Sequence, residues 1–140
     1  MNLRSVDVIT ITAQVYRELA GYCVSKLPVE ACGLLSGREG IAETCWPITN
    51  REESPTAFTM DEAELDMVLE EIERSGEELV GMFHSHPTAA AKPSPFDKEH
   101  IVFPCSYLIL SLASGRPRLR SYKPQEGELI PERITIIYDK

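Results

Sequence analysis

Two histidines and an aspartate near the middle of the chain could together form a metal centre. His84 and His86 stand two positions apart at the end of Leu79–His86, a mostly apolar segment of strand length that Pro87 closes. Because alternate side chains of a strand project from the same face, both imidazoles should point to one side. Asp97 follows in the first turn of a predicted short helix. Two imidazoles and a carboxylate are typical zinc ligands, and three protein ligands leave a fourth position for water, as in catalytic zinc sites.

Each part of this pattern also has a simpler explanation. Ser94 followed three residues later by Asp97 is a capping box, and Pro95 occupies the favoured first position of the helix that follows. Two histidines at strand spacing are a weak signal by themselves. His100 lies three residues after Asp97 and could support or replace a ligand, but we expect it to be an exposed helical histidine.

The combination of a strand-borne histidine pair and a helix-borne acid resembles the motif of the JAMM family of zinc metallopeptidases, also called MPN+ or JAB. The family motif is H-[ST]-H-P-x6-S-x2-D with an upstream glutamate, and the segment from His84 to Asp97 matches it at every fixed position. The upstream segment PVEACGLLSG, residues 28–37, resembles the strand P-x-E-x-C-G-L-L-x-G of the same family. Agreement at two separated segments makes this a specific resemblance.

The resemblance implies a role for each residue of the motif. His84, His86 and Asp97 would bind one zinc ion, with water as the fourth ligand. Glu30 would be the general base that takes a proton from this water, and Ser94 would donate a hydrogen bond to the oxyanion that forms on the scissile carbonyl. Cys32 shares a strand face with Glu30, and we expect it to be a buried thiol.

The resemblance also implies a reaction and a substrate. JAMM peptidases hydrolyse the peptide or isopeptide bond after the C-terminal Gly-Gly of ubiquitin or ubiquitin-like proteins. The chain has only 43 residues after Asp97, which is similar to the compact, stand-alone prokaryotic form associated with ubiquitin-like sulfur carriers. We therefore expect a zinc-dependent, isopeptidase- or deubiquitinase-like metallopeptidase whose partner is a ubiquitin-like or sulfur-carrier protein. Two alternatives stay open: a non-catalytic MPN scaffold that binds partners, and a zinc amidohydrolase with another amide substrate.

The hydrophobic pattern predicts an α/β (α+β) fold, with a mixed central sheet flanked by two or three helices. The resemblance implies that this is one MPN/JAB domain over residues 1–140, with a cytidine-deaminase-like architecture. Helices are expected at Ala13–Lys26 after a Thr12 cap, from a Thr59/Glu62 capping box to Gly76, and at Pro95–Val102. Strands are expected at Val6–Ile11, Glu30–Gly37, Ile41–Ile48, Leu79–His86, Ser106–Leu112, Arg118–Lys123 and Arg133–Tyr138.

Three arginines alternate through the sixth of these strands and the turn before it. Arg116, Arg118 and Arg120 could grip a carboxylate or an acidic partner, but a solvated strand face is the simpler interpretation, and we expect that.

Composition narrows the class of protein further. The 140 residues are 43% hydrophobic and 26% charged, which suits one globular domain that needs no disulfide or structural metal to fold. A formal net charge of -8 disfavours nucleic acid or an anionic membrane as a partner. The four cysteines form no CxxC pair and suggest free thiols in a reducing cytoplasm. The first residues contain no export signal, so we expect a cytoplasmic location.

Overall fold

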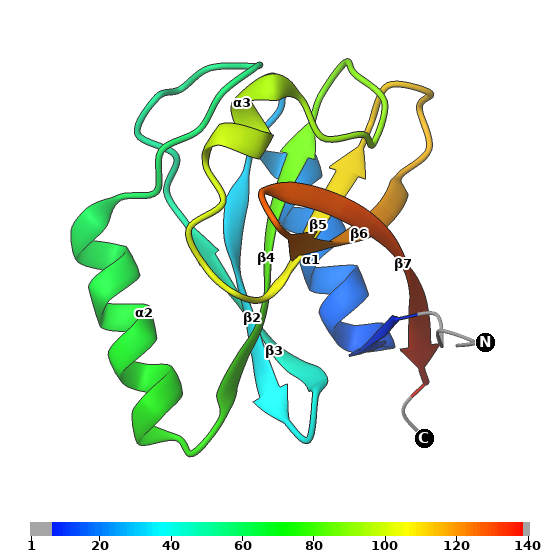
Figure 1. Ribbon diagram of the computed structural model, residues 1–140. Coiled ribbons are helices and arrows are strands. Elements are labelled where there is room, and N and C mark those ends of the chain that lie inside the picture. Colours follow the sequence, from blue (N-terminus) through cyan, green and yellow to red (C-terminus); the bar gives the residue numbers. More distant parts are fainter. Residues whose placement is uncertain (1–6, 139–140) are drawn as a thin grey trace.

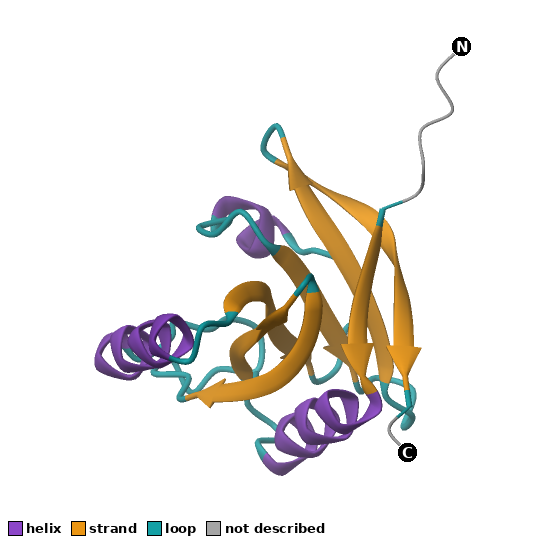
Figure 2. Ribbon diagram, turned by 90° about the horizontal axis from the view of Figure 1, so that it is seen from below, coloured by secondary structure: helices purple, strands orange, loops and turns teal. Residues whose placement is uncertain are grey.

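The structure is a computed structural model that describes residues 7–138. Within this range, a seven-stranded sheet carries three helices on its outside (Figures 1 and 2). In chain order, the elements are β1 (Val8–Thr12), α1 (Ala13–Ser25), β2 (Cys32–Arg38), β3 (Ile41–Ile48), α2 (Glu62–Arg74), β4 (Glu78–His86), α3 (Pro95–Glu99), β5 (Ser106–Ser111), β6 (Arg118–Gln125) and β7 (Glu128–Ile137). The predicted mixture of helices with a mixed sheet is confirmed.

The sheet closes on itself in the order β1-β3-β2-β4-β5-β6-β7, with β7 returning to β1. Strand β1 runs parallel to both of its neighbours, β4 runs parallel to β5, and the other pairs are antiparallel. Closure depends on pairing between the first and last strands, and this pairing was not expected from the sequence. It removes the open edge that the first and last strands of a flat sheet would leave.

Buried side chains lie on both faces of the sheet and form two core clusters. Helix α1 packs Val15, Leu19 and Cys23 into one cluster, and all three side chains are fully buried. Helix α2 packs Ile72 into the other cluster, with the rest of its apolar stripe partly buried against the same face. In Figure 1, α3 lies above the carboxyl ends of the parallel strands β4 and β5. In the part of the chain described here, no helix is long and apolar enough to cross a membrane.

The predicted capping box at Thr59 and Glu62 is wrong, because α2 begins later. Asp61 is the N-cap, and its carboxylate accepts a hydrogen bond from the backbone N–H of Glu64 at 3.0 Å. The Thr59 hydroxyl donates to the carboxylate of Glu52 at 2.7 Å, and Met60 forms a β-bridge with Asn50, so the backbone is still extended where the helix was expected to begin.

Other boundaries also differ from the sequence prediction, and most differ by one or two residues. Strand β2 begins at Cys32, so Glu30 precedes the strand in which it was predicted. Helix α3 ends at Glu99 rather than Val102, because the backbone N–H groups of Val102 and Phe103 donate to the Tyr107 hydroxyl at 2.8 and 2.7 Å. Strand β7 begins five residues earlier than expected, directly after a tight turn in which residues 126 and 127 both have positive φ angles. The first strand begins at Val8, and the predicted start at Val6 lies outside the described residues.

Candidate metal centre

The two histidines and Asp97 converge at the carboxyl end of β4. The Nε2 atom of His84 lies 3.1 Å from one carboxylate oxygen of Asp97, and the Nε2 atom of His86 lies 3.1 Å from the other. The two Nε2 atoms are 3.2 Å apart. All three side chains are buried, and their ligand atoms lie within 4.8 Å of one another. The three side chains form a group that could hold a metal ion.

Hydrogen bonding around His86 fits a ligand role for this group. The Nδ1–H of His86 donates to the backbone carbonyl of Ala90 at 2.7 Å, so Nε2 is the ring nitrogen that faces the cluster. The Nε2 atom of His84 lies 3.2 Å from the Nε2 atom of His86, and the Asp97 carboxylate supplies negative charge beside both. Two imidazole nitrogens and a carboxylate that meet in a buried space are the donor set that a transition-metal cation prefers.

Burial and charge shift the protonation of all three side chains. Burial lowers the pKa of His84, so its imidazole is kept neutral, which is the state that ligates metals. Burial opposes ionisation of Asp97, but hydrogen bonds from the two histidines outweigh it and hold the pKa of this carboxyl well below its usual range. Burial also disfavours a charged His86, yet its hydrogen bonds to Asp97 and Ala90 raise its pKa. The carboxylate is therefore ionised and ready to bind a cation.

Glu30 lies beside this group, just before β2. Strands β2 and β4 pair Cys32 with His84. The Ser85 N–H then donates to the Ala31 carbonyl at 3.0 Å, so the antiparallel register continues and brings Glu30 opposite His86. The Glu30 side chain is only 4% exposed, and its Oε1 atom has no hydrogen-bond partner among the described residues. Burial raises its pKa to about 8. An unpartnered, buried carboxyl beside a candidate metal group is suited to exchange protons with a bound water.

Ser94 is the N-cap of α3, and the predicted capping box is confirmed. The Ser94 Oγ atom accepts a hydrogen bond from the Asp97 N–H at 3.1 Å, and the Ser94 N–H donates to the Asp97 carboxylate at 2.8 Å. The box therefore orients the carboxylate toward the histidines, so the capping explanation and the metal-site explanation are compatible. Because Oγ acts here as an acceptor, the hydroxyl proton of Ser94 remains available for donation to another group.

Two residues that the sequence placed near the site lie outside the metal group. His100 is exposed, stacks on the Phe96 ring with 3.9 Å between ring centroids, and bonds the Phe96 carbonyl through Nδ1 at 2.7 Å. Its exposure is as expected, but it is the C-cap that follows α3 and not a residue of the helix. Cys32 is fully buried, and its thiol donates to the Ile48 carbonyl at 3.4 Å. Burial raises its pKa to about 12, as expected for an inert core thiol.

Sequence reasoning missed three side chains that support the site. Buried Asn50 donates to the Glu30 carbonyl at 2.9 Å. The Phe58 ring stacks on His84 with 4.7 Å between ring centroids. The Ser85 hydroxyl accepts from the Ala31 N–H at 2.8 Å. Only Ser85 had a sequence signal, because it stands between the histidines and must face the opposite side of β4.

Comparison with known proteins agrees with the geometry of this site. Residues 12–124 match the protein family described as prokaryotic homologs of the JAB domain. The chain belongs to this family. Strands β2 and β4 and helix α3, which carry the candidate site, all lie within the matched residues.

Several relatives have peptidase names. The CysO-cysteine peptidase of Mycobacterium tuberculosis is 31% identical over 137 residues, which cover 95% of this chain and 94% of that protein. The desampylase of Pyrococcus furiosus is 40% identical over 89 residues, 63% of this chain and 64% of that protein. The probable TtuB-protein conjugate cleaving protease of Thermus thermophilus is 30% identical over 122 residues, 86% of this chain and 79% of that protein.

Solved structures share the fold. A protein from Desulfitobacterium hafniense has a TM-score of 0.84 and 35% identity, with 94% of each chain covered. A JAB1/MPN domain protein from Archaeoglobus fulgidus has a TM-score of 0.61 and 18% identity, with 91% of this chain and 99% of that chain covered. At that identity, the second likeness supports the fold alone.

Proposed function

We propose that this protein is a zinc-dependent metallopeptidase that hydrolyses the peptide or isopeptide bond after the C-terminal Gly-Gly of a ubiquitin-like or sulfur-carrier protein. The observation that carries the proposal is the convergence of His84, His86 and Asp97 beside the buried, unpartnered carboxyl of Glu30. The set contains three metal ligands and a separate proton acceptor, which is the division of labour that metal-assisted amide hydrolysis requires. A scaffold that only binds partners would need neither.

Each side chain then has a separate task. His84, His86 and Asp97 hold one zinc ion, which when bound supplies Lewis-acid polarisation and lowers the pKa of a coordinated water. Glu30 takes a proton from the attacking water and passes it to the leaving amine, since its carboxyl is buried beside the three ligands with one oxygen free of hydrogen bonds to the described residues. Ser94 uses its free hydroxyl proton to stabilise the oxyanion at the scissile carbonyl.

The names of the relatives support the substrate class. One relative is named for a cysteine attached to CysO, and another for conjugates between TtuB and protein. Both names describe the cleavage of something attached to a protein. We assign a substrate of the same kind to this chain: a ubiquitin-like carrier whose flexible tail enters the site.

We also propose that residues 1–140 act as one domain in the cytoplasm. All four cysteines are free thiols, and three of them are buried, which suits a reducing compartment. The two core clusters share the strands of one closed sheet, which supports a single folding unit.

The test is intact-mass analysis of ubiquitin-like carriers that bear short extensions after Gly-Gly. Each carrier is incubated with the zinc-loaded protein, with its Glu30→Gln variant, and with the protein after chelation. We expect loss of the extension with the zinc-loaded wild type only, and a product mass that ends at Gly-Gly. Full activity of Glu30→Gln would overturn the assignment of Glu30 as the base. A bound zinc ion without cleavage of any carrier or conjugate would overturn the substrate class.

A further inference from the structure

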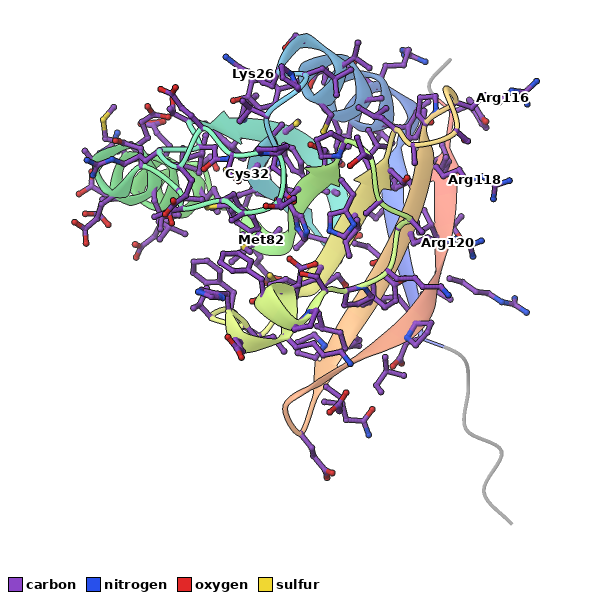
Figure 3. The ribbon with its side chains drawn as sticks, turned by 90° about the horizontal axis from the view of Figure 1, so that it is seen from above. Lys26, Cys32, Met82, Arg116, Arg118 and Arg120 are labelled. Atoms are coloured by element: carbon purple, nitrogen blue, oxygen red, sulfur yellow. The ribbon has the colours of Figure 1, made fainter. Side chains whose placement is uncertain are left out.

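The structure concentrates positive charge on β6 and the turn before it, in an otherwise acidic protein. Residues 113–125 contain four basic residues and no acidic one, whereas the whole chain carries a net charge of -8. Arg116, Arg118 and Arg120, here called the arginine row, are exposed. Figure 3 shows them side by side, projecting outward from one flank of the barrel. Among residues 7–138, none of the three guanidinium groups forms an ion pair. Like charges on one strand face repel one another, so the row does not help the chain fold.

The register of the sheet aligns this row with the metal centre. His86 pairs with Ser111 on β5, and Ser111 pairs with Arg118 on β6. His84 is aligned with Arg120 in the same way. Residues paired in register project from the same face, so the arginines face the same side as the histidines. Because β5 lies between β4 and β6, about 10 Å separates the backbone of the arginines from the backbone of the histidines.

A hollow of about 440 Å³ lies between the arginine row and the loop that follows β4. Arg118, Arg120 and the exposed Lys92 line it on its basic side. Glu132 also lines the hollow. One of its carboxylate oxygens accepts a hydrogen bond from Ser121 at 2.7 Å and the other has no partner among the described residues, so the hollow contains one acidic side chain beside three basic ones. The loop wall is attached to the site itself, because the Ala90 carbonyl in this wall accepts the Nδ1–H of His86.

These observations point to a docking surface, and this inference rests also on the proposed function. We propose that the arginine row and Lys92 bind acidic side chains on the folded body of an acidic ubiquitin-like substrate, whose tail then reaches the metal centre. Arg118 and Arg120 are about 7 Å apart along β6, with Arg116 in the turn before the strand, and this spread matches several carboxylates on a protein surface rather than one. Two acidic proteins repel at long range, so a local basic surface selects one orientation of approach.

The test compares two substrates of the zinc-loaded protein: a whole acidic carrier with its extended tail, and a synthetic peptide with the sequence of the tail alone. Arg118→Glu combined with Arg120→Glu is expected to lower kcat/KM for the whole carrier about 10-fold more than for the peptide. The matched control reverses two exposed arginines elsewhere, Arg17→Glu on α1 and Arg74→Glu on α2, and should leave this ratio unchanged. Arg118→Gln with Arg120→Gln gives a milder change if charge reversal impairs folding.

Three outcomes would overturn the docking surface. The first is an equal loss for the carrier and the peptide, and the second is no loss for the carrier. The third is that the arginine substitutions no longer lower kcat/KM when the tail ends in a carboxamide. That result would show that the row binds the terminal carboxylate of the tail and not the body of the carrier. If wild type cleaves neither substrate, the proposed function fails separately. Binding of the same carrier to the Glu30→Gln variant, with and without the arginine reversals, then decides whether the surface binds it.

Discussion

Substitution of Ser85 by alanine tests how the protein holds its proposed base. The Ser85 hydroxyl accepts a hydrogen bond from the Ala31 N–H at 2.8 Å, and Ala31 is the residue directly after Glu30. Ser85 is 0% exposed and Ala31 is 1% exposed, so no solvent can replace the lost acceptor. An unpaired, buried N–H group costs about 1–3 kcal/mol. For a domain of this size, that corresponds to a decrease in melting temperature of roughly 4–12 °C.

The same change should separate catalysis from metal binding. The three proposed ligands keep their own hydrogen bonds, so the Ser85→Ala variant should still bind one zinc ion per chain. Glu30 loses the backbone anchor next to it, so kcat should fall even where the variant is fully folded. Urea unfolding, followed by the fluorescence of the single tryptophan Trp46, measures the free energy of unfolding. Zinc content and carrier cleavage are measured on the same samples.

Ser106→Ala is the matched control. Ser106 is a buried serine on the neighbouring strand β5, and its hydroxyl makes no hydrogen bond with any other part of the chain described. This control should cost less than about 0.5 kcal/mol and leave kcat unchanged. If Ser85→Ala costs no more stability than Ser106→Ala, the hydrogen bond to Ala31 does not hold this segment. If Ser85→Ala loses its zinc, Ser85 acts on the metal site and not on Glu30.

Three further predictions concern the metal, pH and packing. Asp97→Ala should bind less than one zinc ion per chain, whereas His100→Ala should keep one; equal zinc contents by elemental analysis would remove Asp97 from the ligand set. In the metal-free protein, the pKa of Glu30 is raised by burial from 4.5 to about 8, so the folded state binds more protons and stability should fall as pH rises through that range. Glu30→Gln should therefore stabilise the metal-free protein at pH 9 by about 3–5 kcal/mol and have little effect at pH 4. Urea unfolding with a chelator present measures both values, and an equal effect of the substitution at the two pH values would contradict the prediction. Gly33→Ala should destabilise the protein by about 1–3 kcal/mol, because a methyl group there meets an aromatic ring and a backbone oxygen at 2.4 Å. Gly21→Ala, in open space on α1, should instead stabilise it by about 0.5–1 kcal/mol; thermal melts that rank the two variants the other way would contradict the packing described here.

The parts of the site that depend on local backbone geometry were predictable from the sequence. His84 and His86 had to share a face because side chains alternate along any strand. Ser94 and Asp97 had to face each other because a helix begins between them, and the capping box forms within one turn. The cap of α2 was missed because both Thr59 and Asp61 are good N-cap residues, and the difference between them is the β-bridge that Met60 forms with the distant Asn50.

What only the tertiary structure decided is the set of contacts between segments far apart in the chain. The sequence by itself determined the types of the proposed ligands, their spacing, and the strand and helix that carry them. It did not determine that β7 closes the sheet against β1, that Asn50 holds Glu30, or that Arg118 stands in register with His86. The periodicity of a sequence indicates a strand but not the strand with which it pairs. The length of the connection does not decide the partner either, because loop-closure entropy changes little with that length. These contacts were therefore set by the packing of the whole core, which selects one register because a shift of one residue would turn every buried side chain to the wrong face.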